Sequence, residues 1–193
     1  IMWQVRFVSF FVNRFKGAKQ IIAWELGNEA NCMQAVNRRS QAWLWTSSLA
    51  NAIRAVDGSR PVLSGMHGLD AAGSWTVADH AELLDVLTTH TYPVFTAYCD
   101  REPVNAMGTL LHATAETRLM ADLSAKPCFV EEFGTLGPMI ASDVVAATYL
   151  RASLYSLWAH DCRGLFWWCA YDQVELDFPP YQWNATECEL GLY

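Results

Sequence analysis

Acidic side chains follow two short apolar runs of this chain. The first run, at 21–24, leads into Asn28 and Glu29, and the second, at 127–130, leads into the pair Glu131–Glu132. An apolar run that ends in carboxylates indicates a buried strand that delivers acids to one edge of a fold. Two carboxyl groups about 5 to 5.5 Å apart can cleave a glycosidic bond, one as acid and the other as nucleophile. The pattern therefore suggests glycosidase chemistry.

Each of these acids also has a plainer interpretation. Glu29 alone could sit at a helix start and interact with the helix dipole, but the counterpart at Glu132 favours catalysis. Neighbouring strand residues point to opposite faces, so we expect Glu132 to face the site and Glu131 to face a helix layer with a cationic partner. Glu25 is either a deep carboxylate that tunes Glu29 or a structural acid.

Histidine and tyrosine stand at the ends of two other apolar stretches. His90 and Tyr92 close a strand predicted over 86–92. A core histidine bonded to a carbonyl is the alternative for His90, although the spacing of His90 and Tyr92 on that strand favours a functional role. His67 ends another predicted strand, and nothing nearby in the sequence defines its role.

Nine tryptophans raise the possibility of sugar-stacking platforms, because an aromatic face packs well on the apolar face of a pyranose. Trp167 and Trp168 cannot both face one side of a strand, and we choose Trp168 because it precedes the strand exit. Trp75 and Trp183 lie in predicted loops and are weaker candidates. Those in helical stretches are expected to be packing residues: Trp3, Trp43, Trp45 and Trp158.

Metal and cofactor motifs are absent from the sequence. No HxH, HExxH or clustered Cys/His spacing occurs, so we expect no metal site and no cofactor. The six cysteines show no CxxC spacing, and Cys128 and Cys169 lie within apolar strands, where cysteine behaves as a small hydrophobe. We expect these cysteines to be reduced.

Strands and helices alternate along the chain, as in parallel β/α units. No nucleotide-binding glycine motif follows any strand, whereas active-site residues of a β/α barrel sit at the carboxyl ends of several strands. The barrel is therefore favoured over a doubly wound sheet. Strands are predicted at 20–27, 60–67, 86–92, 126–134 and 164–171, and helices at 1–16, 36–56, 76–84, 108–124 and 141–160.

Composition limits the partners. The 193 residues suit one packed domain, with 52% hydrophobic and 17% charged residues and a formal charge of −7. A chain without a basic face argues against nucleic acid or an anionic membrane as partner, and no apolar run reaches the length of a membrane span. The expected partner is an oligo- or polysaccharide; the oligomeric state is not indicated.

Several motifs together resemble those of clan A glycoside hydrolases, especially glycoside hydrolase family 5, the cellulase and mannanase relatives. They are WELGNE at 24–29, the His90-x-Tyr92 pair, EFG at 132–134 and Trp168 on the last predicted strand. Their order and spacing match strands four, six, seven and eight of that family's barrel. The resemblance implies a retaining glycoside hydrolase that cleaves a β-linked glucoside or mannoside by double displacement.

The resemblance also implies roles. Glu29 would be the general acid/base, because the family's acid follows an asparagine at the end of strand four, and Asn28 would bind the sugar 2-hydroxyl. Glu132 would be the nucleophile. Tyr92 and His90 would hold that nucleophile and the substrate in place, and the tryptophan of the last strand would form the floor of the sugar subsite.

On this reading residues 1–193 form a single partial (β/α)8 TIM barrel with parallel strands four to eight, lacking the first three strands and the final helix. Such a sheet would have two unpaired edges, and we expect it to aggregate easily and to be inactive alone. The alternatives are a non-catalytic carbohydrate-binding barrel or an inactive fragment. A serine-dependent β/α hydrolase is less favoured than these alternatives, because no GxSxG motif is present.

Overall fold

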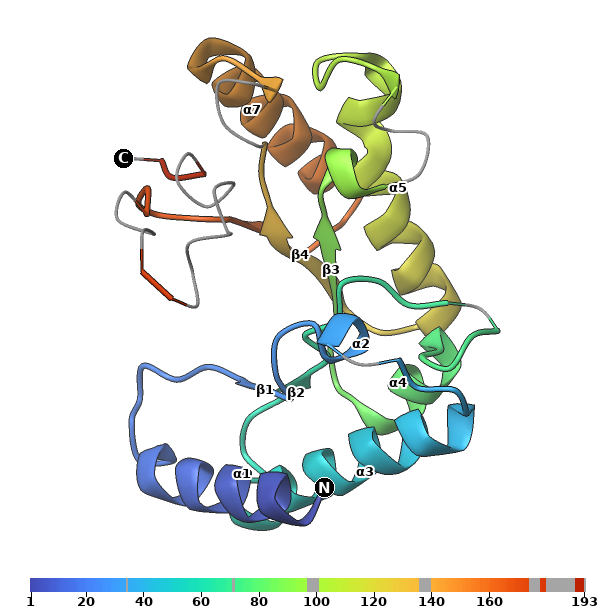
Figure 1. Cartoon of the computed structure of the whole chain (residues 1–193), viewed down its shortest axis with the longest axis vertical. Helices are drawn as coiled ribbons and strands as arrows, with labels where there is room; N and C mark the ends of the chain where they lie inside the picture. Colours follow the sequence, from blue (N-terminus) through green and yellow to red (C-terminus); the bar gives the residue numbers. More distant parts are fainter. Residues whose placement is uncertain are drawn as a thin grey trace. The chain divides into compact units, whose positions relative to one another are not determined.

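The computed structural model describes residues 1–33, 35–70, 72–96, 101–135, 140–173, 178–179 and 190–192. Helices and strands alternate through these residues, as Figure 1 shows, so the predicted β/α alternation is confirmed. The elements are α1 (Met2–Phe15), β1 (Trp24–Glu25), α2 (Ala30–Met33), α3 (Arg39–Val56), β2 (Val62–Leu63), α4 (Val77–Leu83), β3 (Leu87–Thr91), the 3-10 helix η1 (Pro93–Phe95), α5 (Met107–Ser124), β4 (Cys128–Phe133), α7 (Asp143–Ala159) and β5 (Leu165–Trp167).

The described strands are parallel wherever their register is given. Trp24 pairs with Val62 between β1 and β2, and Val130 pairs with Leu165 between β4 and β5. The strands form one sheet in the order β1-β2 and another in the order β3-β4-β5. A single parallel bridge joins Leu63 to Val86. Neighbours in sequence are thus neighbours in the sheets, as in β/α units.

The first two strands are much shorter than the sequence predicts. β1 covers two residues of the predicted 20–27, and β2 covers two of the predicted 60–67. Gly27 has φ +142° and Gly65 has φ +63°, and such backbone does not continue a strand. The chain therefore leaves each ladder early, and the polar residues that follow lie in turns.

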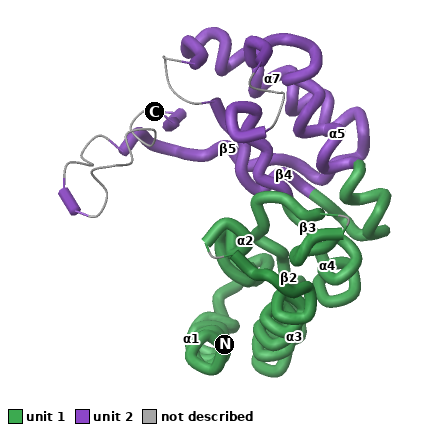
Figure 2. Tube along the Cα trace, turned by 45° about the vertical axis from the view of Figure 1, so that its right-hand side comes forward, with its two compact units in different colours: residues 1–88, 119–128 green, residues 89–118, 129–193 purple. Residues whose placement is uncertain are grey.

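The chain divides into two compact units, which Figure 2 colours separately: residues 1–88 with 119–128, and residues 89–118 with 129–193. In the first unit, α1 packs along α3. The core beneath them gathers side chains from both helices and both short strands. Its buried members include Val12, Trp24, Leu49, Ile53 and Val62.

In the second unit, α5 and α7 lie side by side (Figure 1), and Thr114 Oγ1 donates to Ser156 Oγ at 2.8 Å between them. Phe133 at the end of β4 stacks on Tyr149 of α7, with ring centroids 4.7 Å apart. Both rings are fully buried. This packing fixes the end of β4, which carries Glu131 and Glu132.

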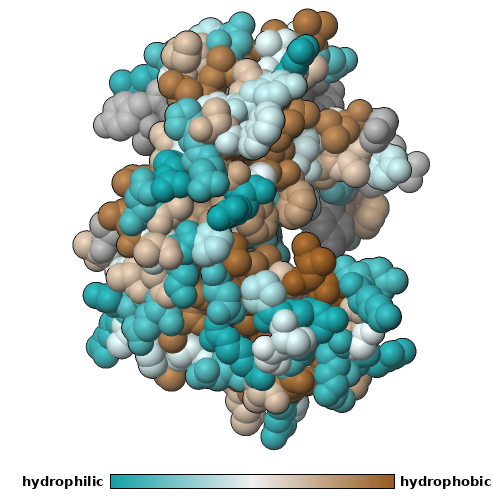
Figure 3. Space-filling model, turned by 180° about the vertical axis from the view of Figure 1, so that it is seen from behind, coloured by the Kyte–Doolittle hydropathy of each residue, from teal (hydrophilic) through white to brown (hydrophobic). Residues whose placement is uncertain are grey.

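Apolar side chains also reach the surface. On the face shown in Figure 3, brown apolar residues interrupt the hydrophilic ones in several places. Two tryptophans expected to pack are instead largely exposed, Trp3 at 71% and Trp158 at 75%, so that expectation is wrong for them. Among the described residues, none of the helices combines the length and the apolar character needed to cross a membrane.

Candidate active-site residues

Glu29 lies in the turn between β1 and α2, in the first unit. Its φ is +47°, which is uncommon for a residue with a side chain and is held only where the surroundings impose it. The backbone N–H of Glu29 donates to the carbonyl oxygen of Gly65 at 2.7 Å. This bond ties the turn after β1 to the turn after β2.

Gly65 has no room for a side chain. A Cβ at this position would lie 2.5 Å from Glu25 Oε1 and 2.5 Å from the carbonyl oxygen of Gly27. Its φ of +63° also favours glycine. The close approach lets the two turns meet, and it places the Glu25 carboxylate against the residue that accepts the Glu29 hydrogen bond.

His67 is the side chain beside Glu29. Its Nδ1 lies 3.0 Å from Glu29 Oε1, and both side chains are partly exposed. The sequence left the role of His67 open, and the structure brings it to the predicted acid/base. Asn28, the predicted sugar ligand, is exposed in the same turn; its contact with a sugar stays a prediction.

Asn31 fastens α2 to the loop after β2. Its Nδ2 donates to the Gly68 carbonyl oxygen at 2.9 Å, and its Oδ1 accepts from the His67 backbone N–H at 3.2 Å. The next residue, Cys32, follows Glu29 by one helical turn. Partial burial, and then the charge of Glu29, raise the pKa of the Cys32 thiol.

Neither Asn31 nor Cys32 was singled out from the sequence. The only available signal was that they follow Glu29 by two and three residues. This spacing is informative only if a helix begins after Glu29, and a helix of four residues is too short to produce a detectable periodicity.

Glu132, the predicted nucleophile, lies on β4 in the second unit with both of its predicted partners. Tyr92 Oη donates to Glu132 Oε2 at 2.9 Å. His90 Nδ1 lies 3.6 Å from Glu132 Oε1, within ion-pair range when the imidazole is protonated but too long for a hydrogen bond. Tyr92 and His90 are buried, so the surrounding packing restricts the movement of both side chains beside the carboxylate.

Glu131 shares a partner with Glu132. Its Oε2 lies 3.4 Å from His90 Nε2, so the two nitrogens of one imidazole each approach one of the two carboxylates. The expectation that strand alternation would separate Glu131 from the surroundings of Glu132 is therefore wrong. The partner of Glu131 is the histidine of the neighbouring strand.

A β-bulge explains this exception. Val130 pairs with Leu165, whereas Phe133 pairs with Trp167, so β4 uses three steps where β5 uses two. The extra residue falls at Glu131–Glu132. A bulge disrupts the ladder locally and re-aims side chains, which removes the basis of an argument from strict alternation.

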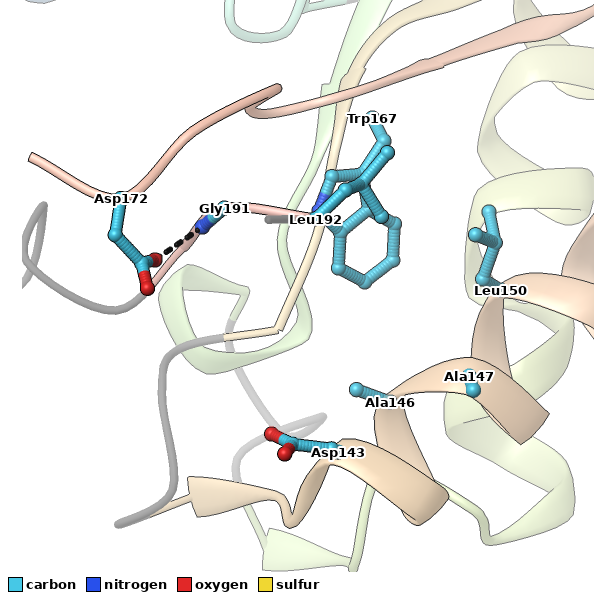
Figure 4. Close-up of a pocket in the computed structure, with 8 residues that line it drawn as sticks. All are labelled: Asp143, Ala146, Ala147, Leu150, Trp167, Asp172, Gly191 and Leu192. Atoms are coloured by element: carbon cyan, nitrogen blue, oxygen red, sulfur yellow. Dashed lines mark hydrogen bonds between the residues drawn. The ribbon is translucent and has the colours of Figure 1, made fainter.

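Trp167 lines a pocket of about 410 Å³ on the side of β5 that faces α7 (Figure 4). Its ring also lies edge-on to Phe133, at 5.8 Å between centroids. Trp168 is 36% exposed, and both its predicted orientation toward the site and its role as a sugar floor stay predictions. The residues around the pocket are Asp143, Ala146, Ala147, Leu150, Trp167, Asp172, Gly191 and Leu192.

Trp75 is not a sugar platform. It is 9% exposed and packs edge-on to Trp45 with centroids 5.6 Å apart, so its proposed role as a subsite is wrong. Trp183 lies outside the described residues, as do Cys99 and Cys188. The other four cysteines form no disulfide among the described residues, and the expectation that the cysteines are reduced stays a prediction.

Each unit thus carries one predicted catalytic carboxylate with a histidine beside it. In the first unit the pair is Glu29 and His67, and in the second it is Glu132 and His90, joined by Tyr92. A carboxylate that accepts a tyrosine hydrogen bond is held in one orientation, as a nucleophile requires.

Known proteins resemble this chain both in sequence and in fold. No family model matches the chain. Mannan endo-1,4-beta-mannosidase A of Hypocrea jecorina is 30% identical over 145 residues, which cover 67% of this chain and 30% of that protein. The chain resembles a part of the clan A, family 5-like glycoside hydrolases.

Solved structures of this clan extend the likeness to the fold. A GH5_18 protein from Streptomyces cattleya, in complex with Manb1-4GlcNAc, superposes with a TM-score of 0.84 at 19% identity, over 98% of this chain and 48% of its own. The exo-beta-1,4-mannosidase Op5Man5 from Opitutaceae bacterium strain TAV5 gives 0.74 at 25% identity, over 98% and 36%. The predicted α/β fold class of a partial TIM barrel is confirmed, and the chain spans less than half the length of each of these relatives.

Proposed function

We propose that the protein hydrolyses β-linked mannosides as a retaining glycoside hydrolase, by double displacement. Two of the most similar proteins carry β-mannosidase names, which favours a mannoside over the glucoside left open by the sequence. The observation that carries the proposal is the hydrogen bond from Tyr92 to Glu132 on a strand end, because it orients a carboxylate for attack.

In the first step, Glu132 attacks the anomeric carbon and forms a glycosyl ester. The glycosidic C–O bond breaks, and Glu29 gives its proton to the leaving oxygen. In the second step, Glu29 takes a proton from water, the water oxygen bonds to the anomeric carbon, and the ester bond to Glu132 breaks. The anomeric configuration is retained because the carbon is inverted twice.

His67 supports the acid/base residue in this scheme. Its Nδ1 lies at hydrogen-bond distance from Glu29 Oε1. A donor at this nitrogen stabilises the carboxylate of Glu29 in the glycosyl-enzyme, when Glu29 must act as base. His90 lies beside Glu132 in the second unit. Its Nδ1 is 3.6 Å from Glu132 Oε1, and its Nε2 is 3.4 Å from Glu131 Oε2.

The test uses a 2-deoxy-2-fluoro-mannosyl fluoride on the longest natural protein that contains these 193 residues. The wild type should gain one fluoromannosyl mass, on the peptide that holds Glu132. Glu132→Gln should gain none, while Glu131→Gln, its matched neighbour, should still be labelled. Glu29→Gln should hydrolyse aryl mannosides slowly and recover with azide, which needs no base catalysis.

Three results would argue against the proposal. A label on another residue would displace Glu132 as nucleophile, and a product of inverted configuration by NMR would exclude double displacement. Binding of mannooligosaccharides with no turnover and no label would favour the non-catalytic carbohydrate-binding alternative.

A further inference from the structure

Three side chains of metal-binding type meet in the first unit. One ligand atom each from Glu29, Cys32 and His67 lies within 4.8 Å of the others. We propose that these three residues bind one zinc-like divalent cation, and that the bound cation withholds Glu29 from catalysis. The second half of this proposal rests on the proposed role of Glu29; the first half does not.

The donor spacing suits a tetrahedral ion. With Zn–S near 2.3 Å and Zn–N and Zn–O near 2.0 Å, tetrahedral donors stand roughly 3.3 to 3.6 Å apart. His67 Nδ1 and Glu29 Oε1 are already 3.0 Å apart. All three donor atoms lie within 4.8 Å of one another, so a displacement of the Cys32 thiol by about 1 Å would suffice to reach this range.

The backbone around the three donors is fixed. The Cys32 N–H donates to the Glu29 carbonyl oxygen at 2.8 Å, and the Glu29 N–H donates to Gly65. Asn31 binds the backbone on both sides of the His67–Gly68 peptide. These four bonds hold α2 and the loop after β2 together, so a cation meets donors whose positions are largely set in advance.

The donor chemistry selects the class of cation. Thiolate and imidazole with one carboxylate suit Zn²⁺ or Cd²⁺, whereas Mg²⁺ and Ca²⁺ prefer oxygen donors. Cys32 is exposed, which gives the ion access and leaves a fourth position for water. On binding, the thiol proton passes to solvent and the metal–sulfur bond forms. No oxidant or reductant is needed.

Sequence motifs could not indicate this site. Cys32 and His67 are 35 residues apart in the chain, and the sequence led us to expect no metal. The consequence for catalysis follows from the ligands. A carboxylate that coordinates a cation is deprotonated and occupied, so Glu29 could not protonate a leaving group while the ion is bound.

The first test is a titration with Cd²⁺, read by the ultraviolet charge-transfer absorption of a cadmium-bound thiolate. The wild type should bind one equivalent through Cys32. Cys32→Ser and His67→Gln should weaken this binding at least tenfold, while Cys162→Ser, which removes a thiol between α7 and β5, should leave it unchanged. Unchanged affinity and absorption in Cys32→Ser would overturn the proposal.

A second test needs no variant and is therefore independent of folding defects. Zn²⁺ should slow alkylation of Cys32 by iodoacetamide at least tenfold relative to Cys162, measured by peptide mass spectrometry of the wild type. Equal rates with and without Zn²⁺ would overturn the site.

Turnover separates the two halves of the proposal. Zn²⁺ should inhibit aryl mannoside hydrolysis by the wild type, and Cys32→Ser should keep its turnover but lose at least tenfold in zinc sensitivity. Zinc binding without inhibition of an active enzyme would overturn the second half alone. In the longest natural protein that contains these residues, zinc binding without mannosidase turnover would uphold the site and reject the proposed function.

Discussion

At the scale of single residues, the orientation of Glu132 depends on the hydroxyl of Tyr92. Tyr92→Phe removes the donor and leaves the buried ring in place. A hydrogen bond to a charged group contributes about 1.5 to 3 kcal/mol, so we expect kcat/KM on an aryl β-mannoside to fall about 10- to 100-fold. Tyr155→Phe, an exposed tyrosine of α7, is the matched control and should stay at the wild-type rate. Equal rates in Tyr92→Phe and the wild type would remove Tyr92 from the site.

The resemblance to the family 5 motifs indicated much of this arrangement. His90 of β3 and Tyr92, the residue directly after β3, were expected beside Glu132, and they are beside it. The pairing of Glu131 with His90 was not foreseen, because it depends on a bulge that only the strand register reveals. Cys32 was missed since its relation to His67 exists in space and leaves no periodic signal in the sequence.

At the scale of elements, the two turns that follow β1 and β2 meet at Gly65. Gly65→Ala would place a methyl group against Glu25 and the Gly27 backbone at a φ of +63°. Backbone strain of this kind alone usually costs about 1 to 3 kcal/mol. Because the methyl group would also clash with its neighbours, we expect the free energy of unfolding to fall by at least this much. Urea denaturation would measure it. The control is Gly17→Ala, where a Cβ meets nothing within 4 Å and little change is expected.

Helix α4 carries a buried histidine that makes the fold sensitive to acid. Burial lowers the pKa of His80 to about 4 from an ordinary 6.5. Between these values the unfolded chain binds a proton that the folded chain does not, so stability is complete above pH 6.5 and declines as the pH falls toward 4. The total loss is at most about 3 kcal/mol. His80→Leu should flatten this part of the stability profile.

Urea denaturation at pH 7, 5.5 and 4.5 would test the His80 prediction, with the exposed His160→Gln as control. The same slope in His80→Leu and the wild type would contradict it. Asp79 acts in a lower range: the hydrogen bond from Arg39 lowers the pKa of its carboxyl, so its contribution is present above its ordinary pKa and is lost as the pH falls through the lowered value.

The order and type of the long elements followed from the sequence, because apolar periodicity is a property of each segment by itself. Element ends did not follow. β2 stops at Leu63 because Gly65 turns the chain, and α2 arises from the turn at Glu29, so both depend on contacts between segments.

At the scale of the whole molecule, α1 has two apolar faces. Val5, Val8 and Val12 face the core of the first unit. Trp3, Phe7 and Phe10, spaced four and three residues apart, form an exposed stripe, each more than 60% exposed. A helix that is apolar on both sides is typical of buried positions, and an exposed apolar patch promotes association.

The chain also carries a formal charge of −7, so like-charge repulsion opposes association at low ionic strength. Because the Debye length shortens from about 10 Å at 0.1 M salt to about 3 Å at 1 M, we expect self-association to increase with NaCl, as measured by sedimentation velocity. Phe10→Glu should reduce it at every salt concentration. Gln4→Glu adds the same charge to an exposed polar position of α1 and should reduce it less, since the stripe stays intact. Equal effects of the two variants would mean that charge, and not the apolar stripe, controls association.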